Sequence, residues 1–326
     1  MLRALVRLCF FALTAGLLLG PALAGAGSGD RQGRVEGQLV ELHRDVLDGP
    51  PLPGYGLDRG ESTRMLDPDQ PQALVGQQVA VEDTSNAPGL QGQAQETDGV
   101  QQLAAAAGTR TTAVVLVNFA NDTSQPVTPA QMKSRVFTGT GSVSDFYEQQ
   151  SGGTVELGGI ADSTGDVFGW WTLPMNVPTA CPDSSMMTIR QQAVTYGNSQ
   201  GVNLNSYQHV ILYFPDNPGC SWAGLGELPG NWSWINDVNY TSVIAHEVGH
   251  NMGVHHAATL KCGSQTLTSS TSGCSYVEYG DGFDVMGSSS ALMSAWQRAK
   301  LSQLPTAARR SVTASGTHSL DQLNNN

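Results

Sequence analysis

Lysine is scarce in this 326-residue sequence, with only three copies, and acidic residues outnumber Lys and Arg by 28 to 16. The formal net charge is therefore −12. Proteins that bind nucleic acids present clustered Lys and Arg to the phosphate backbone, so this composition excludes nucleic acid as an expected partner. An acidic chain suits an exported, soluble protein, but its charge says little about the substrate.

Long hydrophobic runs are missing except at the N-terminus. Residues 8–19 are apolar, follow Arg3 and Arg7, and precede the small-residue pattern Ala22-Leu23-Ala24. This order is typical of a secretory signal with its cleavage site. The alternative is a membrane anchor, but the run is short for a span. We therefore expect residues 1–24 to be a signal peptide, and the mature chain to be secreted, extracellular or periplasmic, without membrane contact.

Cysteine is absent between residues 10 and 180, and no two cysteines are spaced as CxxC, which argues against a cysteine-bound metal site. Four cysteines remain after residue 24: Cys181, Cys220, Cys262 and Cys274. An even number in an exported chain indicates disulfides, and four cysteines allow three pairings. We expect Cys262 to pair with Cys274, and Cys181 with Cys220. Closing the loop between Cys262 and Cys274 would stabilise the folded chain by about 3 kcal/mol.

The residues that are present point to one stretch, HExxHxxGxxH, which begins at His246 and ends at His256. On a helix His246 and His250 lie on one face, where both imidazoles can bind one metal ion. Glu247 can reach a metal-bound water as general base. Gly253 can end the helix in a left-handed conformation and return His256 as third ligand. Three protein ligands leave one zinc position open, which is the catalytic arrangement.

The stretch resembles the metzincin clan of zinc endopeptidases, and Met286 in Asp284-Val285-Met286-Gly287 resembles the clan's methionine turn. HEVGHNMG together with YGDGFDVMG is most similar to the gametolysin family. The resemblance is specific over residues 221–304 and weaker over 109–220. It implies an α+β fold with α/β-like features: a mixed, mostly parallel five-stranded sheet, an active-site helix and a methionine that supports the zinc without binding it.

Three neighbouring residues need separate interpretation. His255 is expected in solvent or beside the site, since the spacing favours His256 as ligand. Some metzincins have a tyrosine two residues after the turn methionine, but Ser288 occupies that position here, so Tyr279 is given no catalytic role. A thermolysin-like site would take Glu278 as third ligand, and this is disfavoured because Glu278 lies in a Gly-rich, non-helical stretch.

The chain divides into four parts. Residues 1–24 are the signal peptide, and residues 25–108 are expected to be a small β-rich propeptide and linker, with strands at 38–42 and 77–81. An unrelated β domain or a partly disordered segment is the alternative. With no cysteine in this part, latency would need an Asp or steric blockage. Residues 109–305 form the expected catalytic domain, and 306–326 a tail or the start of a β domain, because 310–320 alternates like a strand.

Patterning predicts the elements of the catalytic domain. Strands are expected at 113–119, 154–157, 209–214, 221–226 and 232–235, and helices at 129–136, 144–150, 183–196, 241–252 and 291–301. His209 is expected to begin a strand rather than bind metal. The resemblance places an antiparallel strand beside the cleft, where an extended substrate adds to it. Residues 222–226 are our candidate, with an ordinary Gly-rich loop as the alternative.

The functional hypothesis is a secreted zinc-dependent endopeptidase, synthesised as a zymogen, that cleaves protein or peptide substrates. Zn²⁺ would be held by His246, His250 and His256, with a zinc-bound water as nucleophile and Glu247 as general base. The alternative is a non-catalytic zinc-containing adhesion or binding module on the same fold, which would not need Glu247. Cleavage specificity and oligomeric state are not encoded in any motif we identify.

Overall fold

The computed structural model describes residues 34–46, 54–59, 63–66, 74–82, 95–96, 108–265 and 270–319. The expected signal peptide lies outside the described residues. Within the described part of the chain, no helix combines the length and the apolar character needed to cross a membrane.

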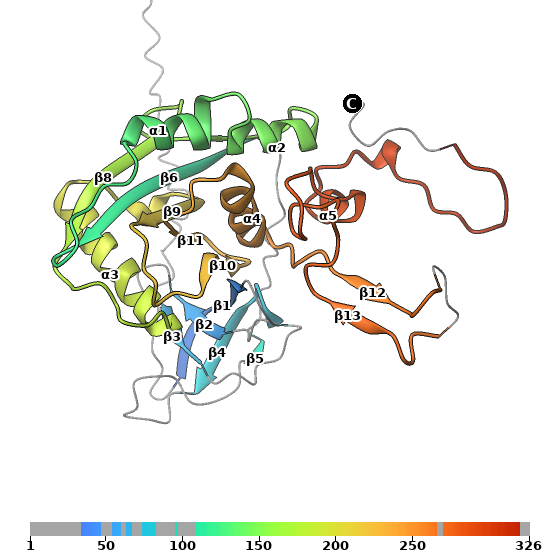
Figure 1. Cartoon of the computed structure of the whole chain (residues 1–326), viewed down its shortest axis with the longest axis horizontal. Coiled ribbons are helices and arrows are strands. Elements are labelled where there is room, and N and C mark those ends of the chain that lie inside the picture. The colour runs from blue at the N-terminus through green and yellow to red at the C-terminus, as the bar shows by residue number, and fades with distance from the viewer. Residues whose placement is uncertain are drawn as a thin grey trace, which may run out of the picture.

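One large mixed sheet organises the molecule (Figure 1). Its strands are β1 (Arg34–Val46), β2 (Gly54–Asp58), β3 (Thr63–Met65), β4 (Gln78–Glu82), β5 (Gln95–Glu96), β6 (Gly108–Phe119), β7 (Val155–Gly158), β8 (Asp166–Leu173), β9 (His209–Phe214), β10 (Trp222–Leu228) and β11 (Trp232–Asn236). A separate hairpin is formed by β12 (Thr259–Lys261) and β13 (Ser275–Val277). The helices are α1 (Pro129–Lys133), α2 (Val143–Ser151), α3 (Asp183–Ser199), α4 (Thr241–Met252) and α5 (Ala295–Lys300).

The strand order is β3-β2-β1-β10-β11-β9-β6-β7, with β8 also paired to β6 and β4 to β1. Strands β7, β8, β9 and β11 join their neighbours in parallel, whereas β10 is antiparallel to β11. The α+β class is confirmed, but the sheet is larger than the five strands expected. Strand β8 was not predicted because Gly169 interrupts its apolar pattern, and the N-terminal strands continue the sheet through the pairing of β1 with β10.

The sheet is buried on both faces, which explains its nearly continuous apolar strands. On β6, Val114 and Leu116 face a core shared with α1, α2 and α4, while Val115 and Val117 face a core shared with α3. Alternating side chains along a strand point to opposite faces, so a single strand supplies both cores. The helices therefore form two outer layers around the sheet, and α4 is held in the layer with α1 and α2.

Local signals set several helix ends, although the helix expected at 129–136 is an α-helix only to Lys133 and continues as a π-helix from Ser134 to Thr138. Thr128 caps α1 in a capping box with Gln131, and Gly152 ends α2 in the left-handed conformation. Helix α4 spans the predicted residues and ends at Gly253, whose φ of 104° is costly for residues other than glycine. The end of helix α4 is thus determined by this one glycine.

Other boundaries differ from the predictions. Helix α3 continues past Gly197 to Ser199, and α5 begins only at Ala295, where Ser294 accepts a hydrogen bond from Gln297 N as its cap. No strand forms among residues 310–319, because that segment is exposed and has no described neighbour to pair with. Alternation alone does not make a strand without a partner.

Both expected disulfides are present, which confirms the pairing. Cys181 is bonded to Cys220, and Cys262 to Cys274. The second bond lies directly after the pairing of Lys261 with Ser275, so it closes the exposed β12–β13 hairpin. This hairpin follows the third motif histidine and precedes Met286.

Candidate metal centre

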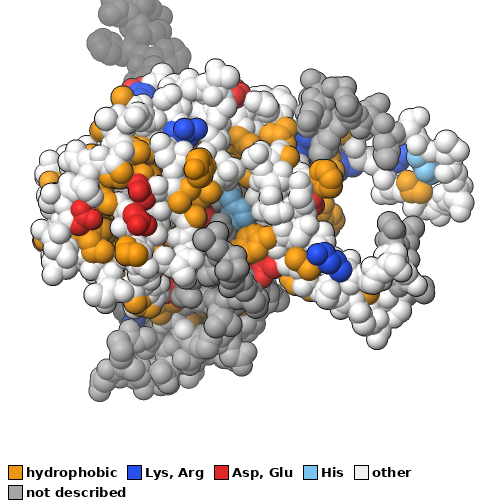
Figure 2. Space-filling view, in the orientation of Figure 1, with side chains coloured by type: hydrophobic (Ala, Val, Ile, Leu, Met, Phe, Trp, Pro, Cys, Tyr) orange, Lys and Arg blue, Asp and Glu red, His pale blue; other side chains and the backbone are white. Residues whose placement is uncertain are grey.

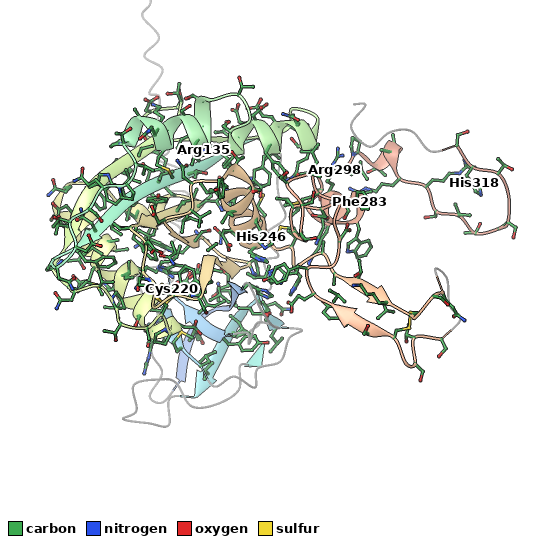
Figure 3. All side chains as sticks on the ribbon, viewed as in Figure 1. Arg135, Cys220, His246, Phe283, Arg298 and His318 are labelled. Atoms are coloured by element: carbon green, nitrogen blue, oxygen red, sulfur yellow. A yellow bond between two sulfur atoms is a disulfide. The ribbon has the colours of Figure 1, made fainter. Side chains whose placement is uncertain are left out.

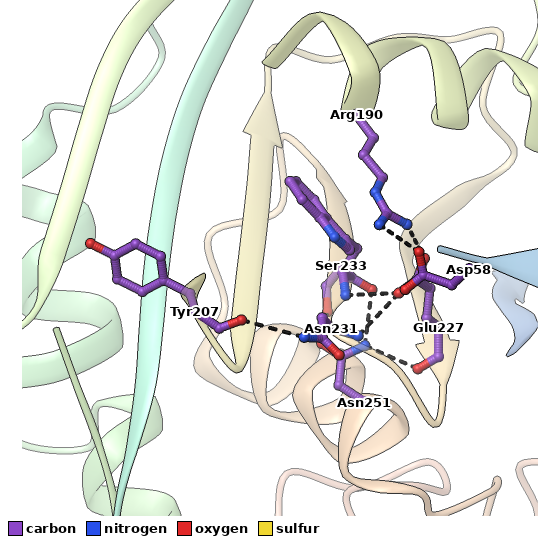
Figure 4. Close-up of polar contacts among 8 residues, drawn as sticks. Asp58, Arg190, Tyr207, Glu227, Asn231, Ser233 and Asn251 are labelled. Carbon is purple, nitrogen blue, oxygen red and sulfur yellow. Dashed lines mark hydrogen bonds and ion pairs between the residues drawn. The ribbon is translucent and has the colours of Figure 1, made fainter. Parts of the chain in front are cut away.

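Helix α4 is anchored to its surroundings at both ends of its buried stretch. Tyr147 of α2 donates a hydrogen bond of 2.7 Å from its hydroxyl to the carbonyl oxygen of Ala245. Near the other end, the Asn251 amide donates to the carbonyl oxygens of Glu227 and Trp232, and accepts from the Ser233 hydroxyl (Figure 4). These bonds tie the helix to α2, β10 and β11, so the side chains between them are held in place.

The three motif histidines meet at one point. Nε2 of His250 lies 3.0 Å from Nε2 of His246 and 3.1 Å from Nε2 of His256. Two nitrogens on a tetrahedral zinc ion are about 3.3 Å apart, given zinc–nitrogen distances of 2.0–2.1 Å. All three side chains are buried, at 4%, 0% and 8% exposure for His246, His250 and His256. In Figure 2, histidine surface appears in a hollow near the middle of the face, bordered by hydrophobic side chains.

The other ring nitrogen of each histidine has an acceptor. Nδ1 lies 2.7 Å from the Val285 carbonyl oxygen in His246, 2.8 Å from that of Val254 in His250, and 2.9 Å from Glu278 Oε1 in His256. Each Nδ1–H donates to its acceptor, which leaves the lone pairs on the three Nε2 atoms. Facing lone pairs repel each other unless a cation lies between them. The residues therefore fit a divalent metal that prefers imidazole, such as zinc.

Glu247 is fully buried beside the histidines, against strand β10. Its side chain fits there because two positions of β10 have no side chain. A Cβ added at Gly226 would lie 3.0 Å from Glu247 Oε2, and one added at Gly224 would overlap the carboxylate. Residues 222–226 thus lie in a strand, as predicted, and do not form the Gly-rich loop that was the alternative. Their glycines make room for the Glu247 carboxylate.

The loop that follows the β12–β13 hairpin, around Met286, packs against helix α4 and the segment after His256. A Cβ at Gly249 would lie 2.7 Å from Met286 Sδ, so the Met286 sulfur packs directly against the backbone of α4 at this glycine. The Met286 carbonyl oxygen accepts a 2.7 Å hydrogen bond from Ala257 N, the residue after His256. Asp284, fully buried, accepts from Met286 N at 2.8 Å and from Ser294 N at 2.7 Å. This fixes the loop whose Val285 carbonyl orients His246.

Sequence reasoning missed three neighbours of the histidines. Glu278, which was disfavoured as a metal ligand, instead contacts Nδ1 of His256. The Tyr279 ring lies 4.1 Å from the His256 ring, centroid to centroid, which restricts that imidazole. Asn251 follows a motif histidine directly, yet no spacing rule assigns it the three hydrogen bonds it makes. Figure 3 places His246 at the junction between the sheet and the C-terminal loops.

A buried ionic cluster lies on the other side of β10 (Figure 4). Arg190 of α3 contacts Asp58 of β2 at 2.8 Å and Glu227 of β10 at 2.7 Å. Burial raises the pKa of Glu227, and the Arg190 guanidinium opposes that rise. Glu227 also accepts hydrogen bonds from the backbone of Asn231 and Trp232. One cation thus joins an N-terminal strand to the strand beside the histidines.

A cavity of about 960 Å³ lies elsewhere, between α2 and the start of α4. Its lining includes Arg135, Asp145, Tyr240 and Ser290, and neither the three histidines nor Glu247. The chemistry of the metal centre is therefore separate from this cavity.

Comparison with known proteins identifies the family of the chain. A family model described as gametolysin peptidase M11 matches residues 111–319, more than half of the chain. No curated protein matches this chain. Among solved structures, a chain from "Structure of a chaperone-substrate complex" is similar at 14% identity with a TM-score of 0.31, over 58% of this chain and 29% of that one. A similarity this low carries no argument.

Proposed function

The chain belongs to the gametolysin peptidase family, a family of metallopeptidases, and from that premise we propose that it is a secreted zinc-dependent endopeptidase. His246, His250 and His256 are the proposed zinc ligands, and Glu247 the general base. The observation that carries the proposal is the convergence of three buried Nε2 atoms whose rings are held through Nδ1.

A zinc ion at this point supplies Lewis-acid activation of water and of the substrate carbonyl. The chain's own residues do the rest. Glu247 accepts the proton of the attacking water and passes it to the leaving amine nitrogen. Its place against Gly224 and Gly226 puts this carboxylate directly beside β10, which is an edge strand only once β1 is no longer paired with it. A peptide added to β10 through main-chain hydrogen bonds would bring its scissile bond past that carboxylate.

Export is part of the proposal. The N-terminal apolar run followed by Ala22-Leu23-Ala24 supports it. Two disulfides fit an oxidising compartment. The segment before residue 109 is the proposed propeptide, because it precedes the matched part of the chain.

The test uses the secreted chain with a site for a specific protease inserted between residues 96 and 108. After cleavage there and separation of the N-terminal segment from the rest of the chain, the protein should hydrolyse unfolded casein and members of a peptide library. A chelator should abolish cleavage and zinc should restore it. A chain that binds zinc yet cleaves nothing under these conditions would instead favour the non-catalytic binding module.

A further inference from the structure

A fourth histidine, His43 of strand β1, lies against the metal centre. Its ring centroid is 4.9 Å from that of His250 and 5.1 Å from that of His256. The candidate ligand atoms of His43, His250 and His256 all lie within 4.8 Å of one another. Since two nitrogens on tetrahedral zinc are about 3.3 Å apart, only a small movement of the His43 side chain separates these atoms from a shared ion.

The strand register explains why His43 points there. Strand β1 pairs antiparallel with β10, and His43 lies opposite Gly226. Leu42, one residue earlier, belongs to the core on the α3 side of the sheet. Since alternate residues point to opposite faces, His43 faces α4, and its cross-strand partner has no side chain to occupy the space. The placement thus follows from the pairing of two strands.

The His43 ring has a neighbouring carboxylate but no hydrogen bond within the described residues. Its side chain is buried, at 7% exposure, and neither ring nitrogen has a hydrogen bond in the described part of the chain. Glu41, on the same face of β1, brings Oε1 to 2.6 Å from Nε2, an ion-pair distance. Buried polar groups are costly without partners, and an imidazole with a nearby carboxylate is a common arrangement at metal sites.

We infer that His43 is a fourth protein ligand of the zinc and that β1 keeps the site latent, an inference that rests on the proposed function. Four protein ligands make a closed, structural-type zinc site with no position for water. Strand β1 meanwhile covers the β10 edge from Glu41 to Val46, where an extended peptide would add. Both the metal and the substrate edge become available only when β1 leaves.

The ionic cluster strengthens this closed state. Asp58 of β2 and Glu227 of β10 share Arg190, and β2 pairs with β1 over five residues. Cutting the chain after β5 does not by itself break these contacts. Release of the N-terminal strands is therefore a separate step from cleavage of the linker.

The experiment reads the metal's ligands directly by X-ray absorption at the zinc edge. It uses the full chain carrying Glu247→Gln, which prevents self-cleavage. The chain with His43 intact should show four imidazoles, and His43→Ala should show three plus an oxygen. His43→Cys should introduce a zinc–sulfur distance of about 2.3 Å, a signal that a merely structural role of residue 43 cannot produce. His318→Cys, far from His246 in Figure 3, is the matched control and should add no sulfur.

A kinetic readout accompanies the spectra. Zinc transfer to a chromogenic chelator should be at least about 10-fold faster from His43→Ala than from the chain with His43 intact. Three imidazoles in both chains, with no sulfur in His43→Cys, would overturn the role of His43 while leaving the three-histidine peptidase standing. A full chain that takes up no zinc would overturn both the role of His43 and the zinc-dependent peptidase. In that case the casein assay above would also show no chelator-sensitive cleavage, which distinguishes this outcome from failure of the His43 role alone.

Discussion

Helix α4 and strand β1 both bring buried histidines to the same point, but they do so in different ways. In α4 the histidines are four residues apart, so helix geometry alone aligns them. In β1, His43 lies roughly 200 residues before them and arrives only because β1 pairs with β10. A site encoded by local spacing can be recognised in the sequence, whereas one encoded by strand pairing requires the fold.

The two regions also differ in what holds them. Helix α4 is fixed by a tyrosine, an asparagine and the loop of Met286, all in the part of the chain that matches the family. Strand β1 lies before that part and is fixed by its ladder, by Leu42 and by the ionic cluster of β2. The first region is built to stay in place, and the second has contacts that can be given up together.

The largest expected effect concerns α4 alone. Glu247→Gln should lower kcat for casein by about 10²–10⁴-fold, because the amide cannot accept the water proton, while the bound zinc per chain stays unchanged. The measurements are the initial rate and the metal content after linker cleavage and removal of the N-terminal segment. Glu148→Gln, an exposed carboxylate of α2, is the matched control. A Glu247→Gln protein with more than a tenth of the normal rate would refute the general-base role.

The next effect concerns the contact between the two regions. Arg190→Met should lower the free energy of unfolding of the full chain by about 3–5 kcal/mol, because it leaves two buried carboxylates without their cation. Urea unfolding followed by tryptophan fluorescence measures this. The exposed Arg310→Met should change it by less than about 0.5 kcal/mol. Equal stability of the two variants would show that the cluster does not hold the N-terminal strands.

A smaller effect sharpens the description of the metal centre. Glu278→Gln should weaken zinc binding by about 10–100-fold, since the His256 ring loses a charged acceptor at Nδ1. Competition with a chelator of known affinity gives the number. The exposed Asp216→Asn serves as control. Unchanged affinity in Glu278→Gln would mean that His256 is oriented by its neighbours, Tyr279 among them, without this carboxylate.

The smallest effect lies in a region remote from both and provides a reference for acid denaturation. Burial opposes ionisation of Asp166, but the Tyr207 hydroxyl and the backbone N–H groups of residues 160–162 outweigh it and lower the pKa of Asp166. A lowered folded-state pKa contributes stability above the ordinary value of about 3.9, and that stability is lost as the pH falls through the folded-state pKa. Asp166→Asn should flatten this acid loss below about pH 4, which thermal unfolding at several pH values measures. An unchanged acid slope would contradict it.

The sequence predicted what depends on near neighbours. The limits of α4 and the left-handed Gly253 followed from spacing and propensity, and the two expected disulfides followed from the number and spacing of the cysteines. It could not predict β8, whose pattern is broken by Gly169, or the merger of the N-terminal strands with the sheet. It also assigned latency to an Asp or steric blockage, since nothing in the residues around His43 distinguishes it from an ordinary strand histidine.

The most direct measurement is an anomalous difference map at the zinc edge from crystals of the full chain. The account predicts one peak about 2.0–2.1 Å from Nε2 of His246, His250 and His256, the distance of zinc–imidazole bonds. A map with no peak at that point, in crystals shown by metal analysis to contain zinc, would contradict the assignment of this centre.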